Sequence, residues 1–463
     1  MWFEWSGQFS VRAGWGASND LGAMKRRSLV GRSRPKSSAA FSVADAAAAT
    51  HRPVINILYG ARGVRGFADG FAMITLPAYL SAIGFDAVQI GIVAAASLLG
   101  SALLTLAVGI VAARCELRRL LLIGALLMGL TGLALPNFQH IAFILLVVFI
   151  GTVNPTAGDI GVLVPVEHAM LARGVSDRER TRAFARYSLV GALATSAGAL
   201  AAATPDVLAA VGVDRLAGLR SMFYGYAAFG LASAALYYRL PRNPPGDSHS
   251  RAGLGPSRGV VFRLAALFGL DAFAGGFVVP SLLALWLFQR FALSLSAASL
   301  FFFWSNVLGA LSYPVAVKLA KRIGLVNTMA LTQIPSNVCL ILAALVPNLA
   351  VALGLLLVRS ALSQMDVPTR TSYVMAIVTP GERAAAASLT AVPRSLASSV
   401  SPALAGALLS TPFSGLPLLL CGGLKIAYDL SLLWAFSHIK PPEEAAAPPS
   451  ALAAPPRRGI PSD

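Results

Sequence analysis

The chain has 463 residues, of which 56% are hydrophobic and only 12% are charged. A soluble domain usually carries about a quarter charged residues, so this composition excludes an ordinary soluble enzyme or binding domain. The net charge of +17 does not indicate nucleic-acid binding, because the basic residues cluster in short linkers and no nucleic-acid motif accompanies them. The apolar blocks are about 20 residues or longer, the length that an α-helix needs to cross a bilayer. The composition therefore predicts a polytopic membrane protein.

The first segment, residues 1–55, differs from the rest of the chain. It is rich in Ser, Ala, Gly and Arg and lacks the apolar region of a signal peptide. We expect a disordered, basic cytoplasmic tail here. Met24 is an alternative start, which would leave residues 1–23 outside the protein. A second disordered tail is expected over residues 439–463.

Twelve apolar segments follow, and turn sequences such as LPNFQH and TPGER separate most of them. Arginine and lysine gather in alternate loops, so the rule that cytoplasmic loops are basic predicts that both termini are cytoplasmic. The predicted spans are 64–84, 88–112, 118–136, 141–170, 183–203, 219–239, 261–288, 295–317, 324–346, 349–378, 384–409 and 416–437.

The long loop at 240–260 divides the spans into two sets of six. A shift of 203 residues brings several features of the two sets into register. It aligns Pro77 with Pro280, Val164-Pro165 with Val367-Pro368, Glu179-Arg180 with Glu382-Arg383, and Arg118-Arg119 with Lys321-Arg322. A constant offset over several features predicts an internal repeat. We therefore expect an all-α membrane protein with two pseudo-symmetric six-helix bundles, at 56–240 and 261–438, joined by a cytoplasmic linker at 241–260.

The loop between spans 2 and 3 reads GIVAARCELRR, in which Gly109 and the basic residues Arg114, Arg118 and Arg119 match a known motif. The second half keeps Arg322 and Gly324 of the same motif in LAKRIGLVNTM. With these motifs and the repeat, residues 56–440 resemble the major facilitator superfamily, and DVPTR resembles an uncharacterised subgroup of bacterial permeases. Ala113 and Glu116 depart from the motif.

The resemblance implies transport by alternating access, with a substrate site near the membrane midplane between the halves. It also implies that the basic loops act as a cytoplasmic gate. We expect a monomer in a bacterial inner membrane, with a small-molecule substrate and the lipid bilayer as its partners. The gate residues predicted on this basis are Arg114, Arg118, Arg119, Glu167, Arg370 and Arg322.

A polar stripe runs along the predicted span at 349–378. It consists of Arg359, Ser363, Asp366, Arg370 and Tyr373. A charge at lipid depth costs at least ~2.5 kcal/mol, so the stripe is expected to face protein or water. Asp366 is expected near the midplane, and Pro368 is expected to kink the helix and free the carbonyl of Gln364. Asp366, between two arginines, fits either a proton carrier or a plain salt bridge.

Other charges lie within predicted spans, and Glu167 occupies the position equivalent to Arg370. We expect Glu167 to pair with Arg114, Arg118 or Arg119 and to hold one access state, or else to form a static anchor. Lys425 and Asp429, spaced i,i+4, are expected to neutralise each other as a structural pair. The candidates for proton coupling and the central cavity are Asp69, Asp159, Asp271, Asp366, Arg359, Arg394, Asn154 and Gln364.

The function expected from these observations is secondary active transport of a small organic molecule, coupled to H+, with export favoured. No cofactor, metal or nucleic acid is expected. An uptake permease or facilitator of the same fold is the alternative, followed by a non-transporting membrane sensor. A polytopic membrane enzyme would need a nucleophile or metal motif such as H-E-x-x-H, and the sequence has none.

Overall fold

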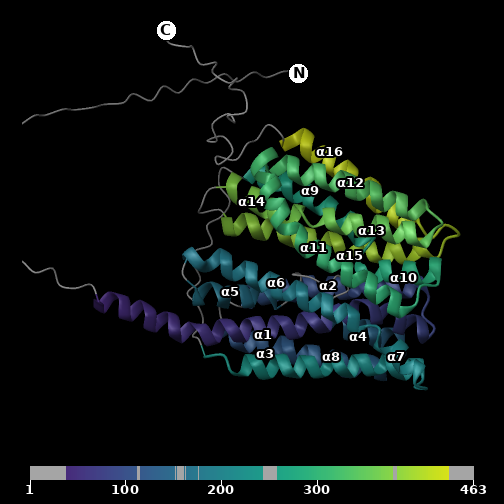
Figure 1. The fold of residues 1–463 in the computed structure, drawn as a ribbon, viewed down its shortest axis with the longest axis horizontal. Helices are drawn as coiled ribbons and strands as arrows, with labels where there is room; N and C mark the ends of the chain where they lie inside the picture. Colours follow the sequence, from purple (N-terminus) through teal and green to yellow (C-terminus); the bar gives the residue numbers. More distant parts are fainter. Residues whose placement is uncertain are drawn as a thin grey trace, which may run out of the picture. The chain divides into compact units, whose positions relative to one another are not determined.

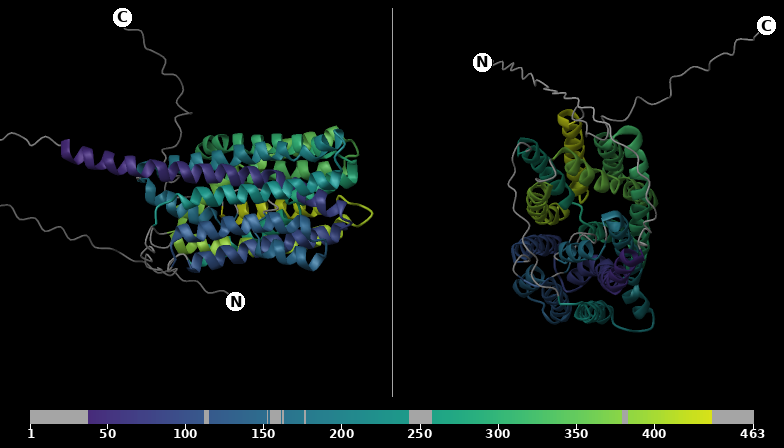
Figure 2. Two further views of the ribbon diagram at one scale, coloured as in Figure 1. Left: turned by 90° about the horizontal axis from the view of Figure 1, so that it is seen from below. Right: turned by 90° about the vertical axis from the view of Figure 1, so that its left-hand side faces the viewer.

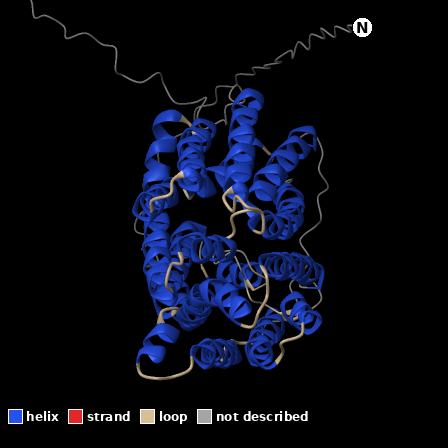
Figure 3. Ribbon diagram, turned by 90° about the vertical axis from the view of Figure 1, so that its right-hand side faces the viewer, coloured by secondary structure: helices blue, strands red, loops and turns tan. Residues whose placement is uncertain are grey.

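The computed structural model describes residues 38–111, 115–151, 153, 161, 163–175, 177–242, 258–378 and 383–436. The chain divides into two compact units, Met1–Ala47 and Ala48–Asp463, and the second of these contains the predicted spans. Within the described residues the regular structure is helical and contains no strand (Figure 3).

Sixteen α-helices and one 3-10 turn are formed by the described residues. The first half contains α1 (Ser38–Ala82), α2 (Ala87–Val111), α3 (Leu117–Ala134), η1 (Leu135–Asn137), α4 (Ile141–Ile150), α5 (Val164–Gly174), α6 (Asp177–Ala201), α7 (Thr204–Ala210) and α8 (Arg215–Tyr238). The second half contains α9 (Arg258–Gly276), α10 (Pro280–Phe291), α11 (Leu295–Ile323), α12 (Leu325–Leu345), α13 (Leu349–Ser363), α14 (Asp366–Ile377), α15 (Arg383–Leu409) and α16 (Leu416–Phe436).

These helices account for all twelve predicted spans. Three spans are broken into the helix pairs α4–α5, α9–α10 and α13–α14, the other nine each contain one long helix, and α7 is a short helix between spans. Seven helical segments are long and apolar enough to cross a membrane by length and composition, and α4 and α13 are shorter apolar helices. The fold class predicted from the sequence is confirmed.

The breaks in spans 4 and 10 follow the internal repeat. In both, a helix restarts at a Val-Pro pair, because α5 begins at Val164 and α14 begins at Asp366, one residue before Val367. Proline is tolerated in the first turn of a helix, where its missing N–H has no partner to lose. The expected kink at Pro368 is displaced: the break lies at Gln364 and Met365. The carbonyl of Gln364 is not free, since it accepts the N–H of Val367 at 3.4 Å.

Helix α1 begins earlier than expected. Its first residue is Ser38, so the segment expected to be disordered through residue 55 is helical in its last part. This part reads SAAFSVADAAAAT, and alanine has the highest helix propensity, which the prediction did not weigh. Residues 1–37 and 437–463, which include the other expected tail, lie outside the described residues.

The two halves of the chain occupy different parts of the second unit. In Figure 1 the purple-to-teal helices of the first half lie mostly below the green-to-yellow helices of the second half. Two helix pairs form most of the contact between the halves: α2 packs against α15, and α6 packs against α11. Figure 2 shows the helices side by side along a common direction. Each half presents large apolar side chains on its exposed surface, such as Leu130 and Leu311, as lipid contact requires.

The helix ends form two sets, which we name by charge. The basic end contains the junctions α2–α3, α5–α6 and α11–α12, and the opposite end contains α1–α2, α10–α11 and α15–α16. In Figure 1, α5 and α14 lie toward the basic end at the left, and α7 and α10 lie toward the opposite end at the right.

The hydrophobic core is continuous between the halves at the opposite end. One cluster of buried side chains includes Tyr79 and Phe223 from the first half and Trp286 and Leu340 from the second. Toward the basic end the core divides into two clusters, one for each half. Tyr187 and Tyr237 belong to the first of these, and Phe268 and Phe436 belong to the second.

Candidate functional site: two buried charge networks

The first half encloses an ion-pair network around Glu167, which is fully buried on α5. Its Oε2 accepts hydrogen bonds from Arg65 on α1 and from Tyr187 on α6. Its Oε1 accepts from the hydroxyl of Tyr237 on α8 at 2.6 Å. Three helices therefore converge on one carboxylate, and both of its oxygens have partners. A buried charge is tolerated when it is paired and hydrogen-bonded in this way.

Arg62 extends the network one turn along α1. Its guanidinium lies over the ring of Tyr187, 5.3 Å from the centroid, a cation–π geometry. The arginine fits there because residue 191 is glycine: a Cβ atom at Gly191 would collide with the guanidinium. On the same helix, Asp69 accepts a hydrogen bond from Tyr226 of α8 at 3.3 Å.

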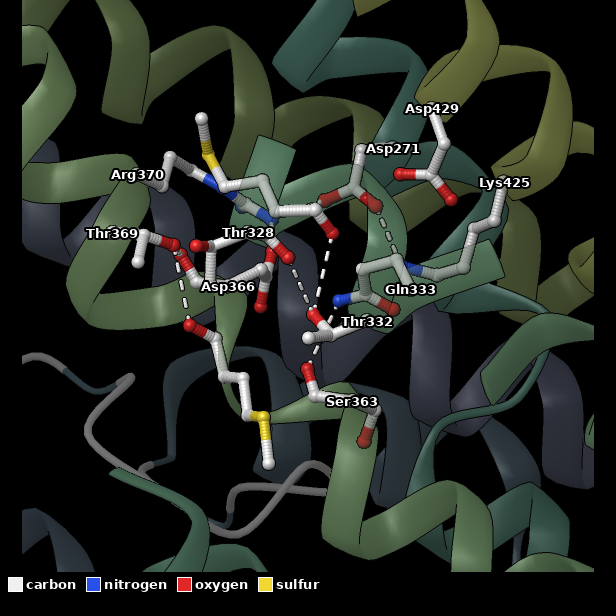
Figure 4. Close-up of polar contacts among 12 residues, drawn as sticks. Asp271, Thr328, Thr332, Gln333, Ser363, Asp366, Thr369, Arg370, Lys425 and Asp429 are labelled. Carbon is white, nitrogen blue, oxygen red and sulfur yellow. Dashed lines mark hydrogen bonds and ion pairs between the residues drawn. The ribbon is translucent and has the colours of Figure 1, made fainter. Parts of the chain in front are cut away.

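The second half contains a chain of alternating charges (Figure 4). Asp366 and Arg370 pair within α14. Arg370 also contacts Asp271 of α9, with 3.0 Å between Nη2 and Oδ2. The other oxygen of Asp271 accepts from Lys425 Nζ of α16 at 2.5 Å. The order Asp366–Arg370–Asp271–Lys425 thus links three helices through side chains that are nearly all buried.

Several polar atoms of this second network have no hydrogen-bond partner within the described part of the chain, including one carboxylate oxygen. The Nε and Nη1 atoms of Arg370 have no hydrogen-bond partner among the described residues, and the same holds for Oδ1 of Asp429. The other oxygen of Asp429 accepts from Asn337 of α12 at 3.1 Å. Arg394 of α15 lies within electrostatic reach of Asp271 and Asp366. Buried polar atoms without partners are costly, which sets this cluster apart from the fully bonded carboxylate of Glu167.

The two networks are related by the repeat, with their charges reversed. The offset of 203 residues aligns Glu167 with Arg370, and each pairs with a residue on the first helix of its own half. In the first half that partner is the cation Arg65, and in the second it is the anion Asp271. The same offset aligns Gly191 with Arg394. In the first half the guanidinium of Arg62 lies beside Gly191, and in the second half the position equivalent to Gly191 is itself an arginine, Arg394.

The predicted pairing of Glu167 with the basic loop differs from the structure. Glu167 pairs with Arg65, because Arg65 lies on the helix that packs beside it, whereas the loop arginines begin α3 at the basic end. Arg118 donates to the carbonyl of Tyr238 at 2.6 Å, and Arg119 pairs with Glu116 at 3.2 Å. Arg114 lies outside the described residues, and Arg322 is exposed at the end of α11.

The predicted pair of Lys425 and Asp429 is also not the arrangement observed. Lys425 extends across to α9, past Gly275, and pairs with Asp271. An i,i+4 spacing permits a pair but does not require one, and Asp271 offers a carboxylate on the facing helix.

The remaining candidates divide between the network and its surroundings. Asp271 and Asp366 are inside the network. Arg359 is apart from it, because Arg370 is the arginine that pairs with Asp366, and the carbonyl of Arg359 accepts from Ser336 at 3.3 Å. Gln364 is exposed at the helix break, while Asn154 and Asp159 lie outside the described residues.

Several residues of the networks have no strong signal in the sequence. Tyr187, Tyr237 and Asn337 are ordinary residues of apolar helices, and only their three-dimensional neighbours reveal them. A stripe of polar residues on α12, including Thr332, Gln333 and Ser336, is completely or nearly buried. Gln333 donates to the carbonyl of Ser363 at 2.9 Å and so joins α12 to the break in span 10 (Figure 4). The i,i+4 spacing of Gln333 and Asn337 is the one signal that sequence inspection offers.

The two halves touch through specific polar and backbone contacts at the opposite end. The Oδ2 atom of Asp206 on α7 accepts from both the N–H and the hydroxyl of Ser296, at 2.9 Å each. Ser296 is in the first turn of α11, so a carboxylate of one half caps a helix of the other half. Nearby, α2 and α15 approach closely at Gly91 and Gly406. A Cβ atom at Gly91 would lie 2.6 Å from the carbonyl oxygen of Pro402.

Comparison with known proteins supports one family. The family model of the Major Facilitator Superfamily matches residues 58–270. An uncharacterised membrane protein of Saccharomyces cerevisiae, YJR124C, is 23% identical over 420 residues, covering 82% of this chain and 94% of that protein.

Solved structures show the same fold. The nucleoside transporter NupG has a TM-score of 0.64 at 16% identity, covering 82% of this chain and 98% of that one. The inward open conformation of the xylose transporter XylE from E. coli has a TM-score of 0.65 at 14% identity, covering 84% and 98%.

Proposed function

Because the chain belongs to the major facilitator superfamily, we propose that it carries a small organic molecule across a membrane by alternating access. In this proposal the present conformation is open toward the basic end. The basic end is the cytoplasmic one, since positive residues favour cytoplasmic loops. Movement of the substrate is coupled to protons, and export is the favoured direction.

The observation that carries this proposal is the division of the core. At the opposite end a single cluster of apolar side chains packs across both halves, and toward the basic end each half has a cluster of its own. Two rigid halves that share a core at one end and separate at the other fit a rocking mechanism about the substrate site.

The second-half network is the coupling site. Asp366 and Asp271 both bond to Arg370, and Lys425 holds the remaining oxygen of Asp271. Protonation of Asp366 or Asp271 would weaken its ion pair with Arg370 or Lys425 and leave excess positive charge in a buried cluster. Movement of the helices would then bring that charge to a new partner or to water. The Glu167 network has saturated oxygens, and it is therefore the static counterpart that fixes the first half.

The experiment uses purified protein in liposomes with a trapped pH-sensitive dye. Drugs, amino acids, sugars, nucleosides and organic acids are added one at a time, and internal pH is followed. Substrate-dependent proton movement that an uncoupler abolishes is the expected result. Uptake of a labelled compound without proton movement would refute the coupling and support a facilitator. Absence of both across the panel would support the non-transporting alternative.

A further inference from the structure

Lys425 has two carboxylates near it, and it is paired with one of them. Its Nζ contacts Asp271 Oδ1 at 2.5 Å. The second acid, Asp429, follows one helical turn later on α16 and is 1% exposed, and its Oδ1 has no partner among the described residues. In Figure 4 both carboxylates lie close to the lysine, which is within electrostatic reach of each. Asp429 is thus a buried carboxyl group with one oxygen that has no hydrogen-bond partner in the described part of the chain, and a flexible lysine lies beside it that could pair with it.

We propose that Lys425 alternates between Asp271 and Asp429, and that Asp429 binds a proton while Lys425 is paired with Asp271. This inference rests on the proposed function, and it names Asp429 as a second proton-binding group. In the present conformation, Lys425 neutralises Asp271 and the proton is on Oδ1 of Asp429. When Lys425 moves to Asp429, that proton is released, and Asp271 stays ionised because it keeps its ion pair with Arg370. One proton thus leaves the cluster as the lysine changes partner, and the charge of the cluster falls by one.

The geometry permits this movement. Residues four apart on a helix are neighbours, so Lys425 reaches Asp429 by rotating its side chain alone. The glycine at position 275 leaves room beside Cε and Nζ, which lie 3.7 and 3.8 Å from a Cβ built there. Asn337 holds the other oxygen of Asp429 in place from α12.

Other charged groups also face the two acids. Asp271 faces Arg370 and Asp366 of α14 and Arg394 of α15. When Lys425 departs, Arg370 and Arg394 remain beside Asp271. Asp429 has Lys425 as the cation of its own helix and the carboxylates of Asp271 and Asp366 within electrostatic reach. Lys425 is therefore the cation that serves both acids.

The test is a double-mutant cycle on thermal stability in detergent. Asp271→Asn and Asp429→Asn each leave Lys425 one carboxylate, so each single variant folds. The double variant leaves the lysine with neither, and its melting temperature falls below the sum of the single effects by about 5 °C or more. Lys425→Met in the double variant removes the uncompensated cation and restores most of that loss. The control cycle, Asp69→Asn with Asp429→Asn, is additive, since Asp69 lies on α1 in the first half and bonds to Tyr226 there.

Additive losses in the Asp271 and Asp429 cycle would overturn the proposal, and so would a failure of Lys425→Met to restore the double variant. These stability readouts do not depend on transport, so they separate this inference from the proposed function. In liposomes, Asp429→Asn is expected to keep substrate exchange and lose proton-driven accumulation. Retention of proton-driven accumulation by Asp429→Asn would contradict a proton on Asp429.

Discussion

The cap that Asp206 places on α11 is expected to hold the opposite end closed. Replacing Asp206 with alanine removes both 2.9 Å contacts to Ser296. The N-cap residue of α11, Ser294, is unaffected. Loss of the two exposed hydrogen bonds to the Asp206 carboxylate costs ~1 kcal/mol, and loss of a negative charge beside a helix N-terminus adds ~0.3–1 kcal/mol. Because the cap joins the two halves, the cost falls on the closed state alone. A change of about 1–2 kcal/mol raises the ratio of the opposite-end-open to the closed state roughly 5–30-fold.

This shift is measurable as a distance between spin labels at the opposite end. Suitable label sites are Val211 and Pro347, which are exposed on different halves, after Cys115, Cys339 and Cys421 are replaced. The matched control is Asp214→Ala, because Asp214 caps α8 within the first half through the N–H of Ala217 at 2.9 Å. The reasoning is refuted if Asp206→Ala leaves the distances unchanged, or if Asp214→Ala lengthens them equally.

Three further variants test the two networks and the contact between the halves. Glu167→Ala leaves Arg65 buried without its partner and is expected to cost ~3–5 kcal/mol of stability. The control Asp69→Asn alters one 3.3 Å hydrogen bond and is expected to cost ~1 kcal/mol. Equal melting temperatures for the two variants would contradict the role of Glu167 as the centre of its network. Asp366→Asn is expected to fold and bind substrate but to lose coupled proton movement in liposomes, and normal coupling would assign Asp366 a purely structural role. Gly91→Ala places a Cβ atom 2.6 Å from the carbonyl oxygen of Pro402, so it is expected to lengthen the spin-label distances at the opposite end. Gly109→Ala, on the same helix, is the control, because a Cβ atom there meets nothing within 4 Å and the distances should not change.

The spans and the repeat were predictable because membrane helices follow from local composition. Each of the twelve apolar segments corresponds to a helix or a broken pair, and the Val-Pro pairs mark equivalent breaks in spans 4 and 10. The break before Pro280 was not predicted. The internal repeat aligns Pro280 with Pro77, which lies inside the continuous helix α1, so the repeat gave no indication of a break. The sequence Gly275-Gly276 precedes that break, and two glycines with low helix propensity weaken α9 there.

The charge partners were predictable only in part. Residue spacing on one helix placed Asp366 between Arg359 and Arg370 without choosing between them, and in the structure Asp366 pairs with Arg370. The same reasoning misassigned Lys425, because its partner Asp271 is 154 residues away. Glu167 was misassigned for the same reason: its partners Arg65 and Tyr237 lie on α1 and α8. Local periodicity identifies which side chains must be buried, but the choice between two available partners depends on how the helices pack.

The most direct test of alternating access measures both ends of the protein in the same lipid nanodiscs. One label pair, at Val211 and Pro347, reports the opposite end, and a second, at the exposed residues Arg186 and Lys318, reports the basic end. Distances are recorded across a range of pH and with each compound that moves protons in liposomes. Alternating access predicts reciprocal changes, so that populations with a shorter basic-end distance have a longer opposite-end distance. Distances that stay fixed at both ends, or that lengthen together, would contradict it.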